Sequence, residues 1–494
     1  MKTELLPLSE SNEWLGCVLT YGHFSTIHPG HIRYLRHARS LEGQLVIALV
    51  GDEGEGSYPF NQQERAEALS LLGLAEGVLL LRGNELEDAI RKLRPRDLVL
   101  GNEFKQQPDI QDTLNLQRSQ GGSIHFHAGE VHYASTELLS SSEGDLQSRR
   151  NEQFAAACSR HGLNKYQLLS SIDLWSFTRL IVIGDTILDQ YAACEAIGMS
   201  AEAPVVVVRE LEQRNFIGGA AVVAAHIRAL GAQCDLVSVV GSDTTAQLVK
   251  KELANQQIGD GLTCDPTRPT TFKKRYLVEN QKLFRVSRLE DHSLDASIEA
   301  QVIEKLKTLA PKTHGIVVSD FVYGVVTPKI LDVLQELAQK HNLMLFGDLQ
   351  CSSQLGSITR FKNFSLLCPN EREARLALQD KISGIEQISQ RMIKETNCKR
   401  LVMKLGSEGF IAYDRDSKGE RINQAFPALS ANPLDVTGAG DSLLAVMATG
   451  LASHQGMMPT AALATCMGSL AVGRMGNEPI AAEELRKRIE KGLK

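Results

Sequence analysis

Asn432-Pro433-Leu434-Asp435-Val436-Thr437-Gly438-Ala439-Gly440-Asp441-Ser442 is the most informative part of the sequence. Residues 438–440 have little or no side chain, so their backbone amides can point together at an oxyanion. The apolar run at 443–448 predicts a helix whose positive N-terminal end faces the same point. Asp441 lies at that end, where it can accept a proton from a hydroxyl while the amides hold a phosphoryl group. The alternative, a glycine-rich loop with a capping aspartate, is disfavoured by the length of the stretch.

Apolar segments that precede this stretch predict strands alternating with helices. The segments lie at 179–185, 315–320, 343–348, 364–369 and 400–404. We therefore expect a doubly wound parallel sheet with its site at the carboxyl ends of the strands. Asp189 follows the first strand and is expected to bind sugar hydroxyls.

Three further β-rich segments, 203–208, 272–278 and 283–286, are flanked by turns and predict a small sheet that forms a lid. Between them Gly218-Gly219-Ala220-Ala221 opens an alanine-rich helix, where the absence of side chains allows a substrate to approach the backbone closely.

Residues 177–492 resemble the ribokinase, or phosphofructokinase B, family of sugar kinases, whose C-terminal signature matches 432–442. The resemblance implies that Asp441 is the catalytic base and that Gly438, Ala439 and Gly440 form the anion hole. It also implies ATP as a cofactor, with Glu373 of the Asn370-Glu-Arg-Glu373 motif organising Mg²⁺ through water. The other nucleotide-binding residues that it implies are Lys404, Gly406, Gly409 and Thr437. The substrate-binding residues are Asp185, Asp189, Gly218, Gly219, Lys273, Arg275 and Asp320.

Within that family, the chain is most similar to the heptose 7-phosphate kinase half of the bifunctional ADP-heptose synthesis enzymes. The motifs that carry this likeness are Gly184-Asp185, Ser200-Ala-Glu-Ala-Pro204-Val, Gly218-Gly-Ala-Ala221, Arg268-Pro-Thr270-Thr-Phe-Lys-Lys-Arg275, Asn280-Gln281 and Ser319-Asp320-Phe-Val-Tyr-Gly324. Those enzymes pair the kinase with an adenylyltransferase in the opposite order. Val222, Gln190 and Gln350 stand where the pattern has an asparagine, an arginine and a lysine.

A second motif lies near the N-terminus. The short apolar strand Cys17–Tyr21 runs directly into Gly22-His23-Phe24-Ser25-Thr26-Ile27-His28-Pro29-Gly30-His31, and helical spacing follows. His28 and His31 therefore lie where a helix begins at the end of a parallel strand, which is the usual ligand position. Two histidines there can neutralise charge on a pentacovalent phosphorus. A pair of surface histidines or a zinc site are the alternatives.

Residues 14–140 resemble the cytidylyltransferase-like branch of the HxGH nucleotidyltransferases, which implies a Rossmann-like fold. His28 and His31 would be catalytic. The nucleotide-binding residues would be Gly22, Phe24, Arg65, Gly101, Ser135 and Thr136. Three departures from the pattern are Ser25 in place of aspartate, Ala134 in place of serine, and the absence of lysine between Lys2 and Lys92.

His125, His127 and His132 form a small cluster near the end of this region. Alternation places His125 and His127 on one face of a strand, so a metal site is conceivable. A polar edge strand is the favoured interpretation, because no cysteine or aspartate pattern accompanies the histidines.

Residues 140–176 change character, with a polar, turn-rich start and helical spacing after 152. We therefore expect three parts: 1–140 as the nucleotidyltransferase, 141–176 as a linker with connecting helices, and 177–494 as the kinase. A net charge of −6 disfavours nucleic-acid or membrane-surface binding. No apolar run approaches the ~18 residues of a membrane span, and nine cysteines lack a CxxC pair, so a cytoplasmic protein with reduced thiols is expected.

These features together favour a bifunctional enzyme that uses ATP, Mg²⁺ and a second nucleoside triphosphate, ATP or CTP. Its substrate would be a small-molecule sugar phosphate, and its product an ADP-heptose-like nucleotide sugar for surface polysaccharide. We expect a homodimer without nucleic-acid or membrane partners. Two alternatives stay open: a CTP-dependent cytidylyltransferase fused to another carbohydrate kinase, or a kinase whose N-terminal part serves only nucleotide sensing or dimerisation.

Overall fold

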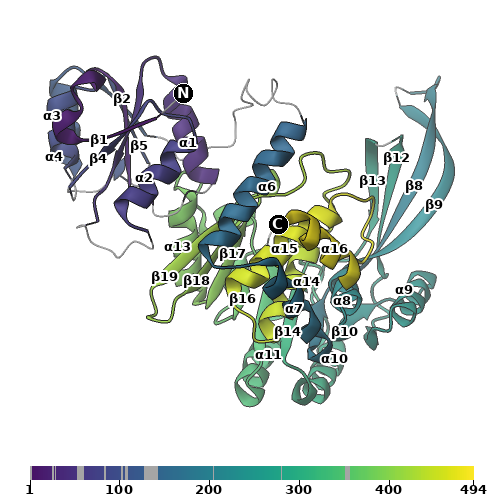
Figure 1. The fold of residues 1–494 in the computed structure, drawn as a ribbon. Coiled ribbons are helices and arrows are strands. Elements are labelled where there is room, and N and C mark those ends of the chain that lie inside the picture. The colour runs from purple at the N-terminus through teal and green to yellow at the C-terminus, as the bar shows by residue number, and fades with distance from the viewer. Residues whose placement is uncertain are drawn as a thin grey trace. The chain divides into compact units, whose positions relative to one another are not determined.

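The computed structural model describes residues 3–24, 27, 29–52, 60–82, 85–101, 104–105, 110–126, 143–203, 205–279, 281–350 and 356–493. The chain divides into two compact units (Figure 1). The first comprises Met1–Ser140, Leu378–Met392 and Asp416–Ala425, and the second Ser141–Ala377, Ile393–Arg415 and Phe426–Lys494. None of the described helices has the length and apolar character that crossing a membrane would require.

The first unit contains a six-stranded parallel sheet with the order β1-β4-β3-β2-β5-β6. Its strands are β1 (Glu4–Pro7), β2 (Val18–Gly22), β3 (Leu45–Leu49), β4 (Gly77–Leu80), β5 (Asp97–Leu100) and β6 (Ser123–Phe126). Its helices are α1 (Pro29–Ser40), α2 (Gln62–Ser70), α3 (Leu86–Leu93) and α4 (Gln111–Ser119). The strand order reverses at β2, between β3 and β5, which is where a ligand site is expected in such a sheet. The Rossmann-like prediction is confirmed.

A nine-stranded sheet forms the body of the kinase region, with the order β11-β10-β7-β14-β15-β16-β17-β18-β19. Its strands are parallel from β11 through β17, and β18 is antiparallel to β17. They are β7 (Arg179–Gly184), β10 (Gln233–Val240), β11 (Gly259–Cys264), β14 (Gly315–Asp320), β15 (Met344–Leu349), β16 (Leu366–Leu367), β17 (Arg400–Lys404), β18 (Phe410–Arg415) and β19 (Arg421–Phe426). The predicted parallel strands are confirmed, although β16 has only two residues.

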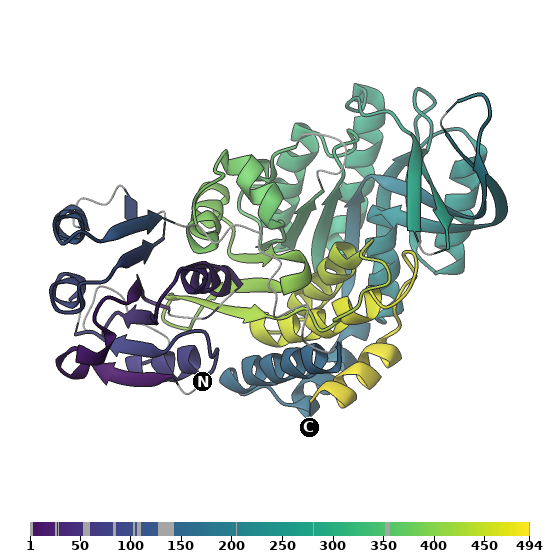
Figure 2. The ribbon, with the colours of Figure 1, turned by 90° about the horizontal axis from the view of Figure 1, so that it is seen from above.

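Helices cover both faces of this sheet. Figure 2 shows the strands between α10 and α11, in green, and α14 and α15, in yellow. The helices are α8 (Ala220–Ala229), α9 (Thr244–Asn255), α10 (Ala296–Leu309), α11 (Pro328–His341), α12 (Glu371–Leu378), α13 (Ile385–Thr396), α14 (Ala439–Ala452), α15 (Met457–Ala471) and α16 (Ala482–Gly492). Every residue of α14 from Asp441 to Ala452 is buried, because this helix packs against α8, α15, β14 and β15. The glycine-rich stretch therefore leads into the central helix of the unit.

A separate four-stranded sheet, called the small sheet below, projects beyond these helices (Figure 1). It consists of β8 (Thr186–Met199), β9 (Val206–Gly219), β12 (Thr271–Val278) and β13 (Gln281–Arg288), in the order β13-β12-β8-β9. The sequence did not predict β8, and it predicted only the first part of β9. Both strands have long exposed ends that face water on two sides, so they lack the alternation of apolar residues by which a strand is usually detected.

Two helices occupy the segment between the predicted parts, α6 (Glu143–Arg160) and α7 (Lys165–Asp173). The helices expected here are present, and they pack against α15 and α16 of the second unit. Gln147 on α6 donates to the Leu429 carbonyl over 2.6 Å and accepts from the Ala431 amide over 3.3 Å. The Arg150 guanidinium donates to the Ser430 carbonyl. Helix α6 is thus tied to the loop at 429–431.

Candidate active site

A cavity of about 610 Å³ lies in the second unit, between the carboxyl ends of the large sheet and the small sheet. It brings together most of the predicted kinase residues: Asp189, Gly219, Lys273, Arg275, Asn370, Glu373, Lys404, Gly406, Gly409, Thr437, Gly438, Ala439, Gly440 and Asp441. Three predicted residues are not among those that line it: Asp185, Gly218 and Asp320.

The glycine loop, defined here as Gly438–Gly440, forms the N-terminal end of α14. Gly438 has a left-handed φ of +78°, and a Cβ atom on it would lie only 2.3 Å from Oδ1 of Asn477, so no larger residue fits. The first intrahelical bond runs from the Ser442 amide to the Gly438 carbonyl over 2.9 Å. The amides of Gly440 and Asp441 precede that bond and belong to the turn whose donors lack helical partners. They can therefore bind an anion, as the sequence predicts.

Asp441 lies in the first turn of α14 and is 4% exposed. Burial, with the nearby negative charge of Asp348, raises the pKa of its carboxyl to about 7. The Gln350 amide donates to Oδ1 of Asp441 over 2.8 Å and favours the charged form. A carboxyl with this pKa exchanges a proton readily near neutral pH, which is what a general base requires.

We expect that Gln350→Leu moves the acid limb of the pH profile of kcat/KM to higher pH by about one unit. The variant removes a hydrogen bond that favours the carboxylate of Asp441, so the pKa of that group rises and more of the base is protonated at neutral pH. Phosphoryl-transfer rates measured from about pH 6 to about pH 9 test this. The rate should recover at the alkaline end, and an unshifted limb would contradict the assignment.

A buried ion pair lies beside the glycine loop. Nζ of Lys404, at the end of β17, is 2.7 Å from Oδ2 of Asp348, at the end of β15. Burial opposes the charge on Lys404, but Asp348 and then Glu373 raise its pKa above the ordinary value. A Cβ atom on Gly440 would lie 3.4 Å from Nζ of Lys404, so the ammonium faces the glycine loop. The sequence analysis names Lys404 as a nucleotide-binding residue, and the structure places its ammonium in this ion pair beside the glycine loop.

The predicted NxxE motif closes on itself at the start of α12. The Asn370 amide donates to Oε2 of Glu373, and the Glu373 amide donates to Oδ1 of Asn370, both over 2.8 Å. This reciprocal capping fixes both side chains at the cavity wall. Glu373 is 6% exposed.

At the other end of the cavity, Asp189 forms an ion pair with Arg275 of β12. Asn477 donates from Nδ2 to Oδ2 of Asp189 over 3.4 Å. Its own Oδ1 is buried and has no hydrogen-bond partner among the described residues. A Cβ atom on Gly218 would lie 2.3 Å from Oδ2 of Asp189, so Gly218 makes room for this carboxylate rather than lining the cavity. The sequence reasoning did not single out Asn477, because nothing local marks it.

Asp185 does not line the cavity, but it binds the loop after β14, and Phe321 of that loop does line it. Its carboxylate accepts backbone N–H groups from Phe321 (2.8 Å), Tyr323 (3.2 Å) and Val325 (3.3 Å), and burial together with Asp320 raises its pKa to about 7. Asp320 forms an ion pair with Arg360. The structure therefore places the carboxylates of Asp185 and Asp320, expected to bind substrate, in contacts that hold the loop after β14.

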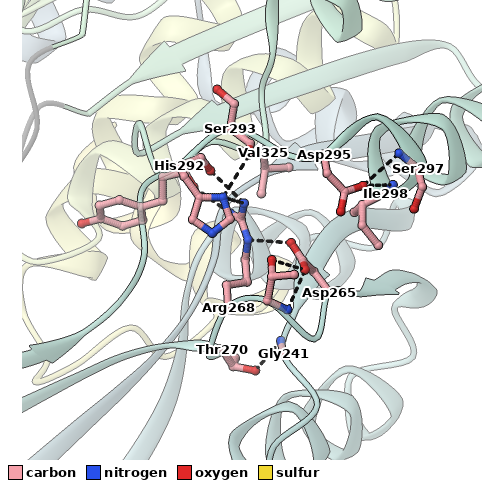
Figure 3. Close-up of polar contacts among 12 residues, drawn as sticks. Gly241, Asp265, Arg268, Thr270, His292, Ser293, Asp295, Ser297, Ile298 and Val325 are labelled. Carbon is pink, nitrogen blue, oxygen red and sulfur yellow. Dashed lines mark hydrogen bonds and ion pairs between the residues drawn. The ribbon is translucent and has the colours of Figure 1, made fainter.

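Arg268 also contacts this loop, and Figure 3 shows it beside Asp265 and His292. Its guanidinium donates to Oδ2 of Asp265 (2.9 Å), to the Tyr323 carbonyl (3.0 Å) and to the His292 carbonyl (2.7 Å). The rings of Phe321 and Tyr323 then lie 5.2 and 5.1 Å from Nζ of Lys273, which is 3% exposed and lines the cavity. A network of buried polar contacts thus positions a cation at the cavity wall.

The three departures from the heptose-kinase pattern lie in different surroundings. Gln350 lines the cavity and contacts Asp441, as described above. Val222 is fully buried within α8, and Gln190 bonds to Asn215 across the small sheet over 2.9 Å. Neither Val222 nor Gln190 is among the residues that line the cavity.

The second predicted site lies in the first unit, at the end of β2. Gly22 ends this strand, and Phe24, with φ of +44°, packs its ring 4.9 Å from the ring of His31 on α1. Gly101 directly follows β5, the neighbouring strand. Gly22, Phe24, His31 and Gly101 therefore lie around the point where the strand order reverses. His28, Ser135 and Thr136 lie outside the described residues.

Arg65, expected to bind nucleotide, is buried beneath this site. Its guanidinium donates to the His23 carbonyl, to the Val50 carbonyl (2.9 Å) and to Oδ1 of Asp52 (2.8 Å). Arg65 thus joins the ends of β2 and β3, and its position indicates a structural contribution. The sequence could not reveal this, because its acceptors are backbone carbonyls distant in the chain.

His125 lies on β6, at the edge of the sheet, and its Nε2 is 2.8 Å from Oδ1 of Asp97. The prediction of a polar edge strand is confirmed for this residue. No group of side chains suited to a metal ion occurs in the described part of the chain, which does not include His127 or His132.

Comparison with known proteins agrees with this two-part organisation. Residues 178–483 match the pfkB family of carbohydrate kinases, and residues 19–143 match the cytidylyltransferase-like family. The bifunctional protein HldE of Geobacter sulfurreducens is 31% identical over 309 residues, which cover 62% of this chain and 61% of that protein. HldE of Campylobacter jejuni subsp. doylei is 27% identical over 311 residues, covering 62% and 64%. The chain thus spans less than two thirds of the length of these relatives.

Solved structures share the fold of the second unit. Phosphofructokinase-2 from Escherichia coli superposes with a TM-score of 0.54 at 19% identity, covering 64% of this chain and 99% of that one. Ribokinase from Thermotoga maritima gives a TM-score of 0.50 at 18% identity, covering 64% and 100%. At these identities the likeness is one of fold. Because the family match extends over more than half of the sequence and includes the glycine loop and Asp441, the chain belongs to the pfkB family of carbohydrate kinases.

Proposed function

We propose that the protein is a bifunctional enzyme that makes a nucleotide-activated sugar. Residues 177–494 transfer the γ-phosphoryl group of ATP to a sugar phosphate, and residues 1–140 join a sugar 1-phosphate to a nucleoside triphosphate with release of pyrophosphate. The observation that carries the proposal is Asp441, a buried carboxyl with a pKa of about 7 that lies beside the glycine loop and lines the cavity. The name of the HldE relatives, bifunctional protein, supports two activities in one chain.

In the kinase reaction, Asp441 accepts the proton of the substrate hydroxyl. That oxygen forms a bond to the γ-phosphorus as the bond to the β–γ bridging oxygen breaks, and ADP leaves. The amides of Gly440 and Asp441 stabilise the charge on the transferring group. Asp189 and the unpartnered Oδ1 of Asn477 accept hydrogen bonds from other hydroxyls of the sugar.

The cofactors would be ATP and Mg²⁺, and the residues present fit them. Glu373 and Asn370 supply oxygen atoms at the cavity wall, and Mg²⁺ prefers oxygen ligands. Glu373 would hold the ion through water, and the ion would neutralise charge on the phosphates of the nucleotide. Gly406 and Gly409 lie at the same end of the cavity, where the nucleotide would contact backbone.

A phosphorylated sugar fits the charge of the other end. Lys273 is buried there, and no carboxylate bonds to it among the described residues. Arg275 and Arg285 also line the cavity, and Arg275 is paired with Asp189. A phosphate on the substrate would compensate the charge of Lys273. By the resemblance of its motifs, the substrate would be heptose-like and the product an ADP-heptose-like nucleotide sugar for surface polysaccharide, made by a homodimer.

Two assays on the whole chain, each with its own product, test the proposal. Incubation with ATP and a panel of phosphorylated and free heptoses and hexoses should yield a product heavier by one phosphoryl group. Incubation with sugar 1-phosphates and either ATP or CTP should release pyrophosphate. The nucleotide that supports this release shows whether the product is an ADP-sugar or a CDP-sugar. Failure of every sugar with ATP would overturn the kinase proposal.

For the first unit a second candidate is a nucleotide-sensing or dimerisation module without catalysis. The observation in its favour is Arg65, whose guanidinium is bonded to two carbonyls and Asp52 and so offers less charge to a triphosphate. Nucleotide binding without pyrophosphate release would support this candidate.

We expect His31→Ala to lower pyrophosphate release by about 10²-fold or more, because a donor to the pentacovalent phosphorus is lost. ATP-dependent sugar phosphorylation should be unchanged, since its residues lie in the other unit. His37→Ala is the matched control, a histidine on the same helix about 9 Å further along its axis. Equal losses in both variants, or loss of kinase activity in folded His31→Ala, would contradict two independent sites.

A further inference from the structure

The carboxylate of Asp435, three residues before the glycine loop, gathers donors from several parts of the second unit. Its Oδ1 accepts from the Thr437 amide (3.0 Å), the Thr437 hydroxyl (2.7 Å) and Nζ of Lys282 (2.7 Å). Its Oδ2 accepts from the Tyr191 hydroxyl (3.1 Å) and the Gly476 amide (3.3 Å). Asp435 is 5% exposed. Together with the backbone bond from the Leu434 amide to the Val472 carbonyl, this side chain holds the segment that enters the glycine loop.

Lys282 differs from the other donors in its origin. It lies on β13, the edge strand of the small sheet, and all eight residues of that strand are exposed. Its ammonium nevertheless contacts the segment that precedes the glycine loop, where it also donates to Oγ1 of Thr437 over 2.9 Å. The ammonium of Lys282 thus contacts both Asp435 and Thr437, although Lys282 belongs to the small sheet and the glycine loop does not.

The positive charge of Lys282 compensates the buried carboxylate of Asp435. A buried carboxylate is costly unless a positive charge and hydrogen bonds compensate it. Burial works to raise the pKa of Asp435, but the bonds from Lys282 and Thr437 hold it low, at about 2. Arg275 of the small sheet also lies over the ring of Tyr191, but it is paired with Asp189. Without Lys282, Asp435 would draw in water or shift, and Thr437 would move with it.

We propose that Lys282 is a positioning residue that couples docking of the small sheet to the shape of the glycine loop. When β13 is docked, Lys282 holds Asp435 and Thr437 so that the amides of Gly440 and Asp441 converge on the transferring phosphoryl group. Phosphoryl transfer is then efficient only when the sheet covers the cavity and excludes water. This inference rests on the proposed kinase reaction at that loop.

Arg288 provides a matched control at the other end of the same strand. Its Nη2 donates to Oγ1 of Thr245 over 3.0 Å and lies 3.9 Å from Oδ2 of Asp243, at the start of α9. It is six residues from Lys282, which corresponds to about 20 Å along a strand. Arg288→Gln therefore removes a polar contact of β13 far from the glycine loop, while the pairing of β13 with β12 and the contact of Lys282 keep the strand in place.

The first test needs no catalysis. In the substrate-free, full-length protein, amide hydrogen exchange of a peptide covering 434–443 should be faster in Lys282→Met by about 10-fold. It should be unchanged in Arg288→Gln. The proposal is overturned if exchange is unchanged in Lys282→Met or accelerates equally in both variants. Because this result does not depend on turnover, it distinguishes a failure of the inference from a failure of the proposed function.

The second test is kinetic. Lys282→Met should lower kcat for sugar phosphorylation by about 10- to 100-fold, since displaced oxyanion donors cost rate, with a smaller effect on KM for ATP. Lys282→Arg should keep most of the rate because the guanidinium restores the charge. Arg288→Gln should leave kcat unchanged. If wild-type enzyme is active and Lys282→Met matches it, or Lys282→Arg is as slow as Lys282→Met, the coupling is wrong.

Discussion

Replacing Asp441 with asparagine should lower kcat for sugar phosphorylation by about 10²–10⁴-fold, because the substrate hydroxyl then loses its proton acceptor. The fold should survive, since asparagine has the same shape and can still accept the hydrogen bond from Gln350. Steady-state rates with saturating ATP and the best sugar of the panel measure the effect.

ATP binding provides the control for this variant. Titration calorimetry should give an affinity for ATP close to that of the wild type, because the amides of the glycine loop and the wall formed by Asn370 and Glu373 are unchanged. A rate above about a tenth of the wild-type value would show that Asp441 is not the base.

Replacing Lys404 with methionine should lower the free energy of unfolding of the second unit by about 3–5 kcal/mol, because Asp348 is left buried without its partner. Activity at neutral pH should fall as well. Lys404 lowers the pKa of Asp441, so its loss raises that pKa further and leaves more of the base protonated.

Urea unfolding measures the stability effect. The chain has two tryptophans, Trp14 in the first unit and Trp175 in the second, and both are buried. Trp175 fluorescence in a Trp14→Phe background therefore reports on the second unit. The double variant Lys404→Met/Asp348→Leu should regain most of the stability, since an apolar pair can replace a buried ion pair. An unchanged midpoint in Lys404→Met would contradict the buried pair.

The parts of the fold that the sequence predicts are those with a strong local pattern. The buried strands of the large sheet are continuous apolar runs, and α14 begins where the glycine loop ends. Most of the predicted kinase residues line one cavity, because they follow strands whose carboxyl ends meet at one edge. Local sequence is enough in such cases.

The remainder depends on contacts between distant residues. The sequence predicts Asp185 and Arg65 as ligand groups, because one follows a strand and the other lies beside a motif. In the structure both side chains are hydrogen-bonded to backbone groups elsewhere in the chain. Lys282 and Asp435 are 153 residues apart, and no spacing rule links them. Strand β8 is buried in its first part and exposed at its end, so it lacks the regular alternation by which periodicity detects a strand.

Helix α6 has a practical consequence for dividing the protein. Gln147 and Arg150 hold the loop at 429–431, and Arg150, Leu429, Ser430 and Ala431 form part of the cavity wall. A shortened kinase that starts at 177 would lack this support and should bind nucleotide more weakly, and a fragment that ends at 150 would carry away half of the helix. To separate the two proposed activities, the chain should therefore be divided before Glu143, so that the second fragment begins with α6.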